Sequence, residues 1–270
     1  MGAAKPRTCW PSTRHNTGWR NAAKHSAALP TLEAVKLRRD SVTIPAESLP
    51  AAGYDRLAQQ LIPGYASLAR LAVSLLAVSP LASASEAAVL VAGCGTGGEL
   101  LEARLQRPDW RLTALEPSEP MLAEARRRLD GEGGDAIAWH CTTAEAHAAE
   151  ASFDGALSVL VLQSLADDGA KLAFLSALAR SLRPGGQLVL VDLMRPERSA
   201  LQEQMDAAWL AYQRAGGLKP GSDAPGLLGA ALHPIGRARL DALAEAAGFG
   251  DPAPVFRALD FEGFLLQRRP

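Results

Sequence analysis

The feature that most constrains the fold of this 270-residue chain is a glycine-rich loop that follows an apolar run over 87–92. An amphipathic run over 99–105 comes after the loop, and a second apolar run over 112–115 ends on Glu116. The order strand, glycine loop, helix, strand and acid is typical of the first half of a doubly wound α/β nucleotide-binding sheet. The glycines of the loop are Gly93, Gly95, Gly97 and Gly98.

This loop predicts a ligand as well as a fold. Glycine is needed there because the turn requires positive φ angles and because a ligand must lie against bare backbone. An acid at the tip of the second strand accepts hydrogen bonds from both hydroxyls of a ribose. Gly93, Gly95 and Gly98 also satisfy the dinucleotide pattern G-x-G-x-x-G, which by itself is weak evidence. We predict a nucleoside site, with a plain glycine turn of a metabolic Rossmann domain as the alternative.

Two segments resemble motifs of the class I S-adenosylmethionine-dependent methyltransferases. Residues 89–97, Val-Leu-Val-Ala-Gly-Cys-Gly-Thr-Gly, are similar to the family's first motif, and 116–122, Glu-Pro-Ser-Glu-Pro-Met-Leu, to its second. The resemblance implies a Rossmann-like methyltransferase fold: a doubly wound, seven-stranded, mostly parallel sheet with a C-terminal antiparallel hairpin and N-terminal helices as a lid. It implies S-adenosyl-L-methionine as the cofactor. Val91 departs from the family, which usually has an acid there to help hold the methionine end.

The same resemblance assigns the cofactor-binding residues. Thr143 stands where the family has an acid that bonds to adenine, and Ala144 still offers its backbone amide. The segment 182–186, Leu-Arg-Pro-Gly-Gly, resembles the late motif, which links a helix to a strand through a glycine turn. The complete predicted set is Gly93, Cys94, Gly95, Gly97, Glu116, Pro117, Met121, Thr143, Ala144 and Leu160. The residues alone also predict a third strand over 136–141, with Cys141 at its buried end, and two apolar C-terminal strands over 255–259 and 261–267.

Over roughly residues 50–268 the chain resembles one branch more closely, the carboxy-S-adenosylmethionine synthases of tRNA wobble-uridine modification. In that branch an arginine on the loop after the long helix pairs with the extra carboxylate of the cofactor. The loop 219–225 has no arginine, and Lys219 is a poorer match for bidentate carboxylate binding. We therefore expect ordinary S-adenosylmethionine to bind. The resemblance is carried by 63–65, 162–165, 214–216, 238–240, 247–249 and 255–261.

Three residues are candidates for contact with the methyl acceptor: His233, Tyr65 and Gln163. Methyl transfer from a sulfonium needs mainly alignment in a dry cavity, and a base is required only for a hydroxyl or amine acceptor. His233 adjoins the variable linker 216–232, with a plain surface histidine as the alternative. Gln163 follows the apolar run 156–162, where ligands bind in open sheets, with N-capping as the alternative. Tyr65 follows a Pro-Gly kink, with an ordinary packed aromatic as the alternative.

The composition of the chain indicates which classes of binding partner to expect. Residues 1–32 carry five of the 28 basic side chains and none of the 29 acidic ones, so the remainder is net negative and unsuited to a duplex backbone. No run of eighteen apolar residues is present, and the cysteines share no metal spacing. We expect a cytoplasmic protein with a small-molecule acceptor, without a metal, a membrane partner or direct nucleic-acid binding. Homodimer formation is left open.

The chain divides into a tail and a domain. Residues 1–45 lack apolar periodicity and read as a disordered tail, with an overlong translation start or a transit peptide as alternatives. Residues 46–270 form the predicted methyltransferase domain, which transfers a methyl group to an unidentified acceptor. The alternatives are a carboxy-S-adenosylmethionine synthase-like enzyme of tRNA modification and a catalytically silent cofactor-binding protein, as Val91 and Thr143 suggest.

Overall fold

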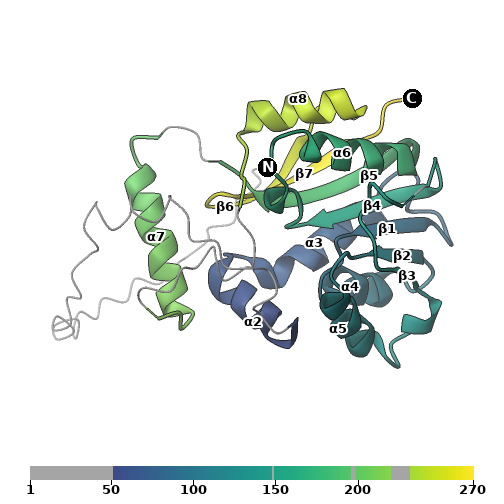
Figure 1. The fold of residues 1–270 in the computed structure, drawn as a ribbon, viewed down its shortest axis with the longest axis horizontal. Helices are drawn as coiled ribbons and strands as arrows, with labels where there is room; N and C mark the ends of the chain where they lie inside the picture. Colours follow the sequence, from purple (N-terminus) through teal and green to yellow (C-terminus); the bar gives the residue numbers. More distant parts are fainter. Residues whose placement is uncertain (1–50, 148, 196–198, 220–231) are drawn as a thin grey trace, which may run out of the picture.

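The computed structural model describes residues 51–147, 149–195, 199–219 and 232–270. The predicted tail over 1–45 and most of the linker over 216–232 lie outside the described residues. A single seven-stranded sheet has the strand order β3-β2-β1-β4-β5-β7-β6 (Figure 1). Its strands are β1 (Ala88–Ala92), β2 (Arg111–Leu115), β3 (Ala138–His140), β4 (Phe153–Val159), β5 (Leu182–Leu193), β6 (Ala253–Ala258) and β7 (Phe261–Gln267).

The pairing confirms the predicted topology. Strands β1 to β5 pair in parallel, whereas β7 runs antiparallel to both β5 and β6. The carboxyl ends of β1 and β4 therefore meet at one edge of the sheet, where open α/β sheets bind ligands. The C-terminal hairpin is the predicted one, formed by β6 and β7.

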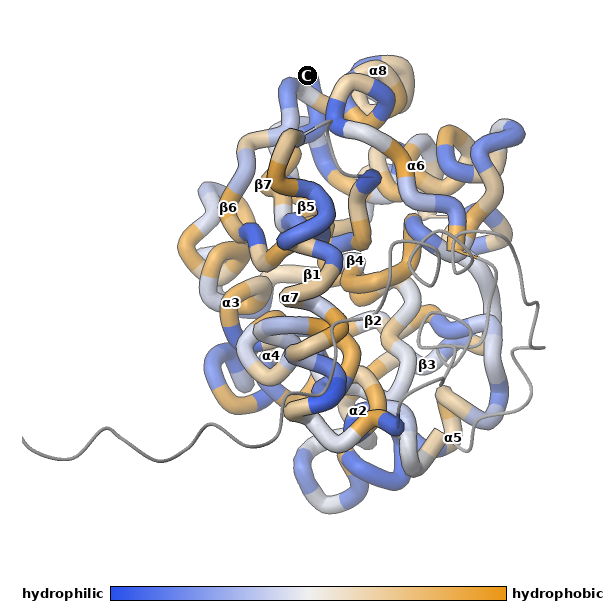
Figure 2. The backbone as a smooth tube through the Cα atoms, turned by 90° about the vertical axis from the view of Figure 1, so that its left-hand side faces the viewer, coloured by the Kyte–Doolittle hydropathy of each residue, from blue (hydrophilic) through white to orange (hydrophobic). Residues whose placement is uncertain are grey.

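Helices cover both faces of the sheet, with α2 to α5 on one face and α6 and α8 on the other (Figure 2). All five residues of β1 are buried. Val89 and Val91 belong to the hydrophobic core under α2 to α5, and Leu90 and Ala92 belong to the core under α6 and α8. Burial on both faces explains why this strand is a continuous apolar run. The helices are α2 (Ala51–Leu61), α3 (Tyr65–Ala77), α4 (Gly98–Gln106), α5 (Glu119–Leu129), α6 (Ala170–Ser181), α7 (Gln202–Ala215) and α8 (Arg237–Ala247).

Two local predictions were wrong. The third strand was expected over 136–141, but Gly134–Ala136 form a 3-10 turn, so the strand covers only 138–140 and Cys141 is exposed rather than buried. The segment 182–186 was expected as a turn before the strand. Instead β5 begins at Leu182, directly after α6, and a register shift against β4 accommodates the glycines.

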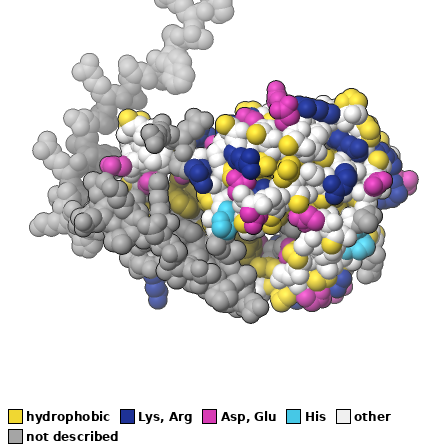
Figure 3. All heavy atoms as spheres, turned by 45° about the horizontal axis from the view of Figure 1, so that its top comes forward, with side chains coloured by type: hydrophobic (Ala, Val, Ile, Leu, Met, Phe, Trp, Pro, Cys, Tyr) yellow, Lys and Arg dark blue, Asp and Glu magenta, His cyan; other side chains and the backbone are white. Residues whose placement is uncertain are grey.

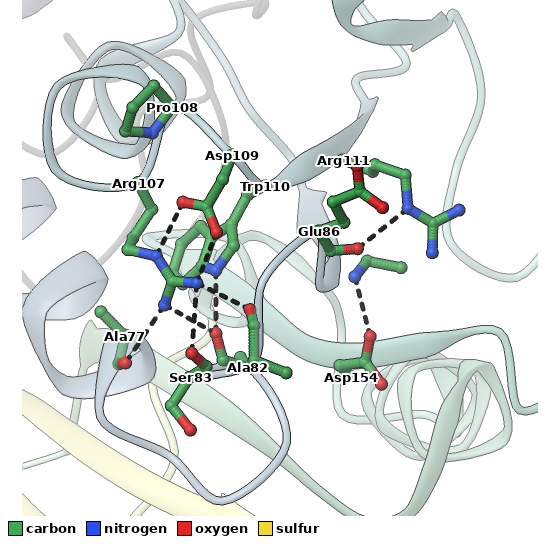
Figure 4. A network of polar contacts seen from close by, with 12 residues as sticks. Ala77, Ala82, Ser83, Glu86, Arg107, Pro108, Asp109, Trp110, Arg111 and Asp154 are labelled. Atoms are coloured by element: carbon green, nitrogen blue, oxygen red, sulfur yellow. Dashed lines mark hydrogen bonds and ion pairs between the residues drawn. The ribbon is translucent and has the colours of Figure 1, made fainter.

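Arg107 organises the irregular connection between α3 and β1 (Figure 4). Its guanidinium donates hydrogen bonds to the carbonyl oxygens of Ala77, Ala82, Ser83 and Ala84 and a bidentate pair to Asp109. The same group lies 5.1 Å from the centroid of the Trp110 ring, and the Trp110 indole N–H also donates to Ala82 O. One side chain thus satisfies four carbonyl oxygens of a connection that lacks regular structure.

Within the described ranges no single helix is long and apolar enough to cross a membrane. The pair Gly53–Leu61 and Tyr65–Ala77 meets that test only when its two helices are joined, by length and composition alone, and it bends by 96°.

Candidate functional site

The glycine loop presents one open position between two tightly packed ones. Gly93, Gly95 and Gly97 all have positive φ angles, of 72°, 50° and 87°. A Cβ on Gly93 would lie 2.4 Å from a methyl carbon of Val161, and one on Gly97 would lie 3.0 Å from Leu129. A Cβ on Gly95 would meet nothing within 4 Å. Gly93 and Gly97 are therefore required by packing, whereas Gly95 leaves bare backbone beside open space.

Glu116 closes the site from the tip of β2. One carboxylate oxygen accepts a hydrogen bond from the Gly95 amide at 3.0 Å, and the other accepts one from the Ser118 amide at 2.9 Å. The residue is only 9% exposed, and this burial raises the pKa of its carboxyl, while both amides act in the opposite direction. A carboxylate offers about four lone-pair positions, so two remain for a ligand diol.

The other predicted cofactor residues differ in how deeply they are buried. Cys94 is buried within the loop, and burial raises the pKa of its thiol. Leu160 directly follows β4 with a φ of 62°, a left-handed conformation that is uncommon for leucine, and it precedes the Val161 that packs on Gly93. Met121 is half-buried on α5, and Pro117 is exposed beside Glu116.

On the adenine side of the predicted site, Thr143 and Ala144 follow β3. Thr143 is exposed, and its hydroxyl accepts a 3.4 Å hydrogen bond from the Ala146 amide. Ala144 is buried, and its side chain belongs to the core under α6. The exposed Cys141 lies 3.5 Å from the Pro117 carbonyl oxygen, which joins the ends of β2 and β3.

Gln163 and His233 meet at the carboxyl end of β4. The His233 amide donates to the Gln163 carbonyl oxygen at 2.7 Å, and the His233 residue is exposed. Gln163 is only 4% exposed, and its side-chain oxygen accepts a hydrogen bond from the Leu193 amide. The structure thus brings together two predicted acceptor-side residues, but the amide oxygen of Gln163 has a partner inside the protein.

A buried charged pair lies beneath this corner. Asp192 of β5 accepts a hydrogen bond from the Gln163 amide at 2.8 Å, and Lys171 of α6 donates to the Leu162 carbonyl oxygen. Asp192 and Lys171 are each 1% exposed. Burial raises the pKa of Asp192 to about 7, although Gln163 and Lys171 oppose the shift. The loop after β4 is therefore fixed to both β5 and α6.

A family model described as "Methyltransferase domain" matches residues 89–186, the segment from β1 into β5. This segment contains the glycine loop, Glu116 and the end of β4. Over this segment the chain is similar to the methyltransferase domain of S-adenosylmethionine-dependent methyltransferases.

Two curated relatives and one solved structure agree with this family. A carboxy-S-adenosyl-L-methionine synthase of Aeromonas salmonicida is 26% identical over 162 residues, 59% of this chain and 64% of the relative. A ubiquinone biosynthesis O-methyltransferase of Methylocella silvestris is 36% identical over 112 residues, 41% of each. The 1,6-didemethyltoxoflavin-N1-methyltransferase of Burkholderia thailandensis shares the fold, with a TM-score of 0.54, 20% identity and coverage of 85% and 94%. The chain therefore spans less than two thirds of the curated relatives it matches.

The candidate site also contains residues that the sequence does not indicate, and they gather around the predicted residue Tyr65. The Tyr65 hydroxyl donates a hydrogen bond to Asp55 of α2 at 2.8 Å. Asp55 also binds Thr96 in the glycine loop and Arg128 of α5. Glu99 is in the first turn of α4; burial first, and then the nearby Asp55, raise the pKa of its carboxyl, and burial first, and then Glu99, raise the pKa of Tyr54. Only the fold brings these groups together, because they come from separate segments.

Glu99 makes the stability of this domain depend on pH. Burial raises the pKa of its carboxyl from 4.5 to about 7. Between these values the folded protein retains a proton that the unfolded chain has released, so the free energy of unfolding falls as the pH rises. We expect Glu99→Gln to flatten this decline, as measured by urea unfolding at intervals from pH 4.5 to pH 7.5. Equal slopes for the variant and the wild type would contradict the assignment.

Proposed function

We propose that this chain is an S-adenosylmethionine-dependent methyltransferase that acts on a small-molecule acceptor. Glu116 carries the assignment, because its carboxylate at the tip of β2 lies 3.0 Å from the Gly95 amide, in the middle of the glycine loop. This pairing places a ribose-binding acid directly beside bare backbone. The match of residues 89–186 to a methyltransferase domain supports the same cofactor.

The residues present fit an adenosyl sulfonium. Gly95 leaves room against its backbone, and Glu116 keeps lone pairs for the two ribose hydroxyls. The partly buried Leu160 and Met121 would provide apolar contacts to the cofactor. When bound, the cofactor supplies an electrophilic methyl group. The protein aligns the acceptor with that group and excludes water from the reacting atoms.

On the acceptor side, we assign the role of base to His233, which is exposed beside the end of β4. Its imidazole takes the proton of a hydroxyl or amine acceptor. Gln163 and Tyr65 serve as positioning residues, since the side chain of each is bonded within the protein, to Leu193 and Asp55.

Two observations favour a small acceptor over a nucleic acid. Relatives and neighbours include methyltransferases named for ubiquinone biosynthesis and for 1,6-didemethyltoxoflavin. On the face that carries α6 and α8, basic and acidic side chains are interspersed (Figure 3), and they form ion pairs such as Arg239–Asp167 at 2.9 Å. Paired charges of this kind leave that face without the basic stripe that a duplex requires.

Native mass spectrometry of the purified full chain tests the cofactor assignment. We expect the protein to carry, or to take up on addition, S-adenosylmethionine or S-adenosylhomocysteine. Calorimetric titration then gives the affinity, and a screen of hydroxyl- and amine-bearing small molecules with methyl-labelled cofactor gives turnover. Absence of any heat or bound mass with S-adenosylmethionine would reject the proposal. Binding without turnover for any acceptor would support the silent cofactor-binding protein instead.

A carboxy-S-adenosylmethionine synthase-like enzyme is the second candidate. The relative of that name from Aeromonas salmonicida matches 59% of this chain. The bound mass separates the two candidates, because the carboxylated cofactor is heavier by one carboxyl group. Lys219 is exposed, and the rest of the corresponding loop, 220–225, lies outside the described residues. We expect the lighter, ordinary cofactor, since a lysine matches a carboxylate less well than an arginine does.

A further inference from the structure

Asp55 joins the first helix of the domain to the glycine loop. One of its carboxylate oxygens accepts hydrogen bonds from the Tyr65 hydroxyl and the Thr96 hydroxyl, each at 2.8 Å. The other oxygen lies 2.5 Å from a guanidinium nitrogen of Arg128. The donors come from α3, the glycine loop and α5. A single carboxylate on α2 therefore connects three other segments.

Arg128 closes this network at the loop. The nitrogen that contacts Asp55 also donates to the Thr96 carbonyl oxygen at 2.7 Å and to the Thr96 hydroxyl at 3.0 Å. Thr96 is thus held through both its side chain and its backbone. The side chains of Arg128 and Asp55 are 26% and 31% exposed, so solvent screens this pair less than it screens a pair on the open surface.

The position of Thr96 gives the network its importance. Thr96 stands between Gly95 and Gly97, both of which have positive φ angles. Glycine loses more conformational freedom on ordering than any other residue, so a loop of this composition is costly to fix in one shape. A loop that is already ordered before the ligand arrives binds the ligand more tightly, because no conformational entropy of the loop is lost on binding.

We propose that Asp55 is a positioning residue that holds the glycine loop in its binding shape and holds α2 beside the cofactor. This inference rests on the proposed function for its ligand. The same network connects the loop to α5, the helix that begins three residues after Glu116. Asp55 therefore fixes the glycine loop against α5, the helix that follows the ribose-binding acid, and so supports the arrangement in which Glu116 bonds to the Gly95 amide.

Variants of Thr96 and Asp55 test the inference in the full chain. We expect Asp55→Asn and Thr96→Val each to raise the dissociation constant for S-adenosylmethionine about tenfold, with kcat changed much less. Thr96→Ser retains the hydroxyl and should stay within about twofold of wild type. The double variant Asp55→Asn/Thr96→Val should be no weaker than either single one, because both changes break one network. Wild-type affinity in Asp55→Asn, or fully additive effects in the double variant, would overturn the inference.

A matched control lies on the same helix as Arg128. Arg127 and Glu124 form a bidentate pair on the surface of α5, and Glu124→Gln breaks that pair without reaching the loop. We expect wild-type affinity for this variant, and a tenfold loss here would overturn the inference.

Hydrogen exchange of the ligand-free protein separates this inference from the proposed function. We expect the Gly95, Thr96 and Gly97 amides to exchange faster in Asp55→Asn than in wild type, whereas those of β1 remain unchanged. If wild type does not bind S-adenosylmethionine, the proposed function fails, and faster exchange in the variant still supports the network. Unchanged exchange at these three amides would overturn the network itself.

Discussion

Glu116→Ala raises the dissociation constant for S-adenosylmethionine by about two orders of magnitude, which we expect to be the largest effect of any single change on ligand binding. Two charge-assisted hydrogen bonds to the ribose are lost, each worth about 1.5–3 kcal/mol, and part of that loss is recovered by water. The Gly95 and Ser118 amides lose their partner as well, so the loop becomes less ordered.

Isothermal calorimetry measures this effect, with circular dichroism to confirm that the variant is folded. Glu119→Ala provides the control, because Glu119 lies three residues further on and its side chain is 63% exposed. We expect that variant to bind as wild type does. A change below about threefold in Glu116→Ala would show that the acid is not a ribose ligand.

Arg107→Ala lowers the free energy of unfolding by about 3 kcal/mol. The guanidinium is 17% exposed and donates to four carbonyl oxygens of the connection between α3 and β1. Removing it leaves those oxygens to find water and also ends the contact with the Trp110 ring. A buried polar group without a partner costs more than an average hydrogen bond contributes.

Arg111→Ala is the matched control for this stability measurement. Within the described residues the Arg111 side chain donates one hydrogen bond, to the Glu86 carbonyl oxygen at 2.9 Å (Figure 4). We expect that variant to change the free energy of unfolding by less than about 0.5 kcal/mol. Urea unfolding compares the two, with an unchanged m-value as the sign that the unfolded state is the same. Equal small losses in both variants would contradict the role given to Arg107.

The elements that the sequence predicts well are those whose signal is local. The apolar runs around the glycine loop became β1 and β2, and the two C-terminal runs became the β6–β7 hairpin. The third strand was predicted too long, because the apolar residues at its start are drawn into a turn by Gly133 and Gly134. The apolar composition of a run therefore does not show whether its first residues will join the strand or the preceding turn.

The site was predictable only where it follows a motif. Glu116 and Gly95 meet as the motif implies. Asp55 and Arg128 are 73 residues apart in sequence, and nothing local to either residue indicates the other. Lys171 lies near the start of α6 and would be expected on its solvent face, yet it is buried near Asp192. Their roles depend on tertiary burial, which a single sequence does not contain.

The two ends of α2 have different attachments. Asp55, near its beginning, is fastened to the glycine loop, while its last turn is held by α7, where Trp209 donates to the Leu61 carbonyl oxygen at 2.6 Å and Tyr212 to that of Gln59 at 3.0 Å. Helix α2 therefore links α7 to the glycine loop. A substitution in α7 that displaces α2 is expected to disturb the glycine loop as well, although α7 itself makes none of the contacts described for that loop.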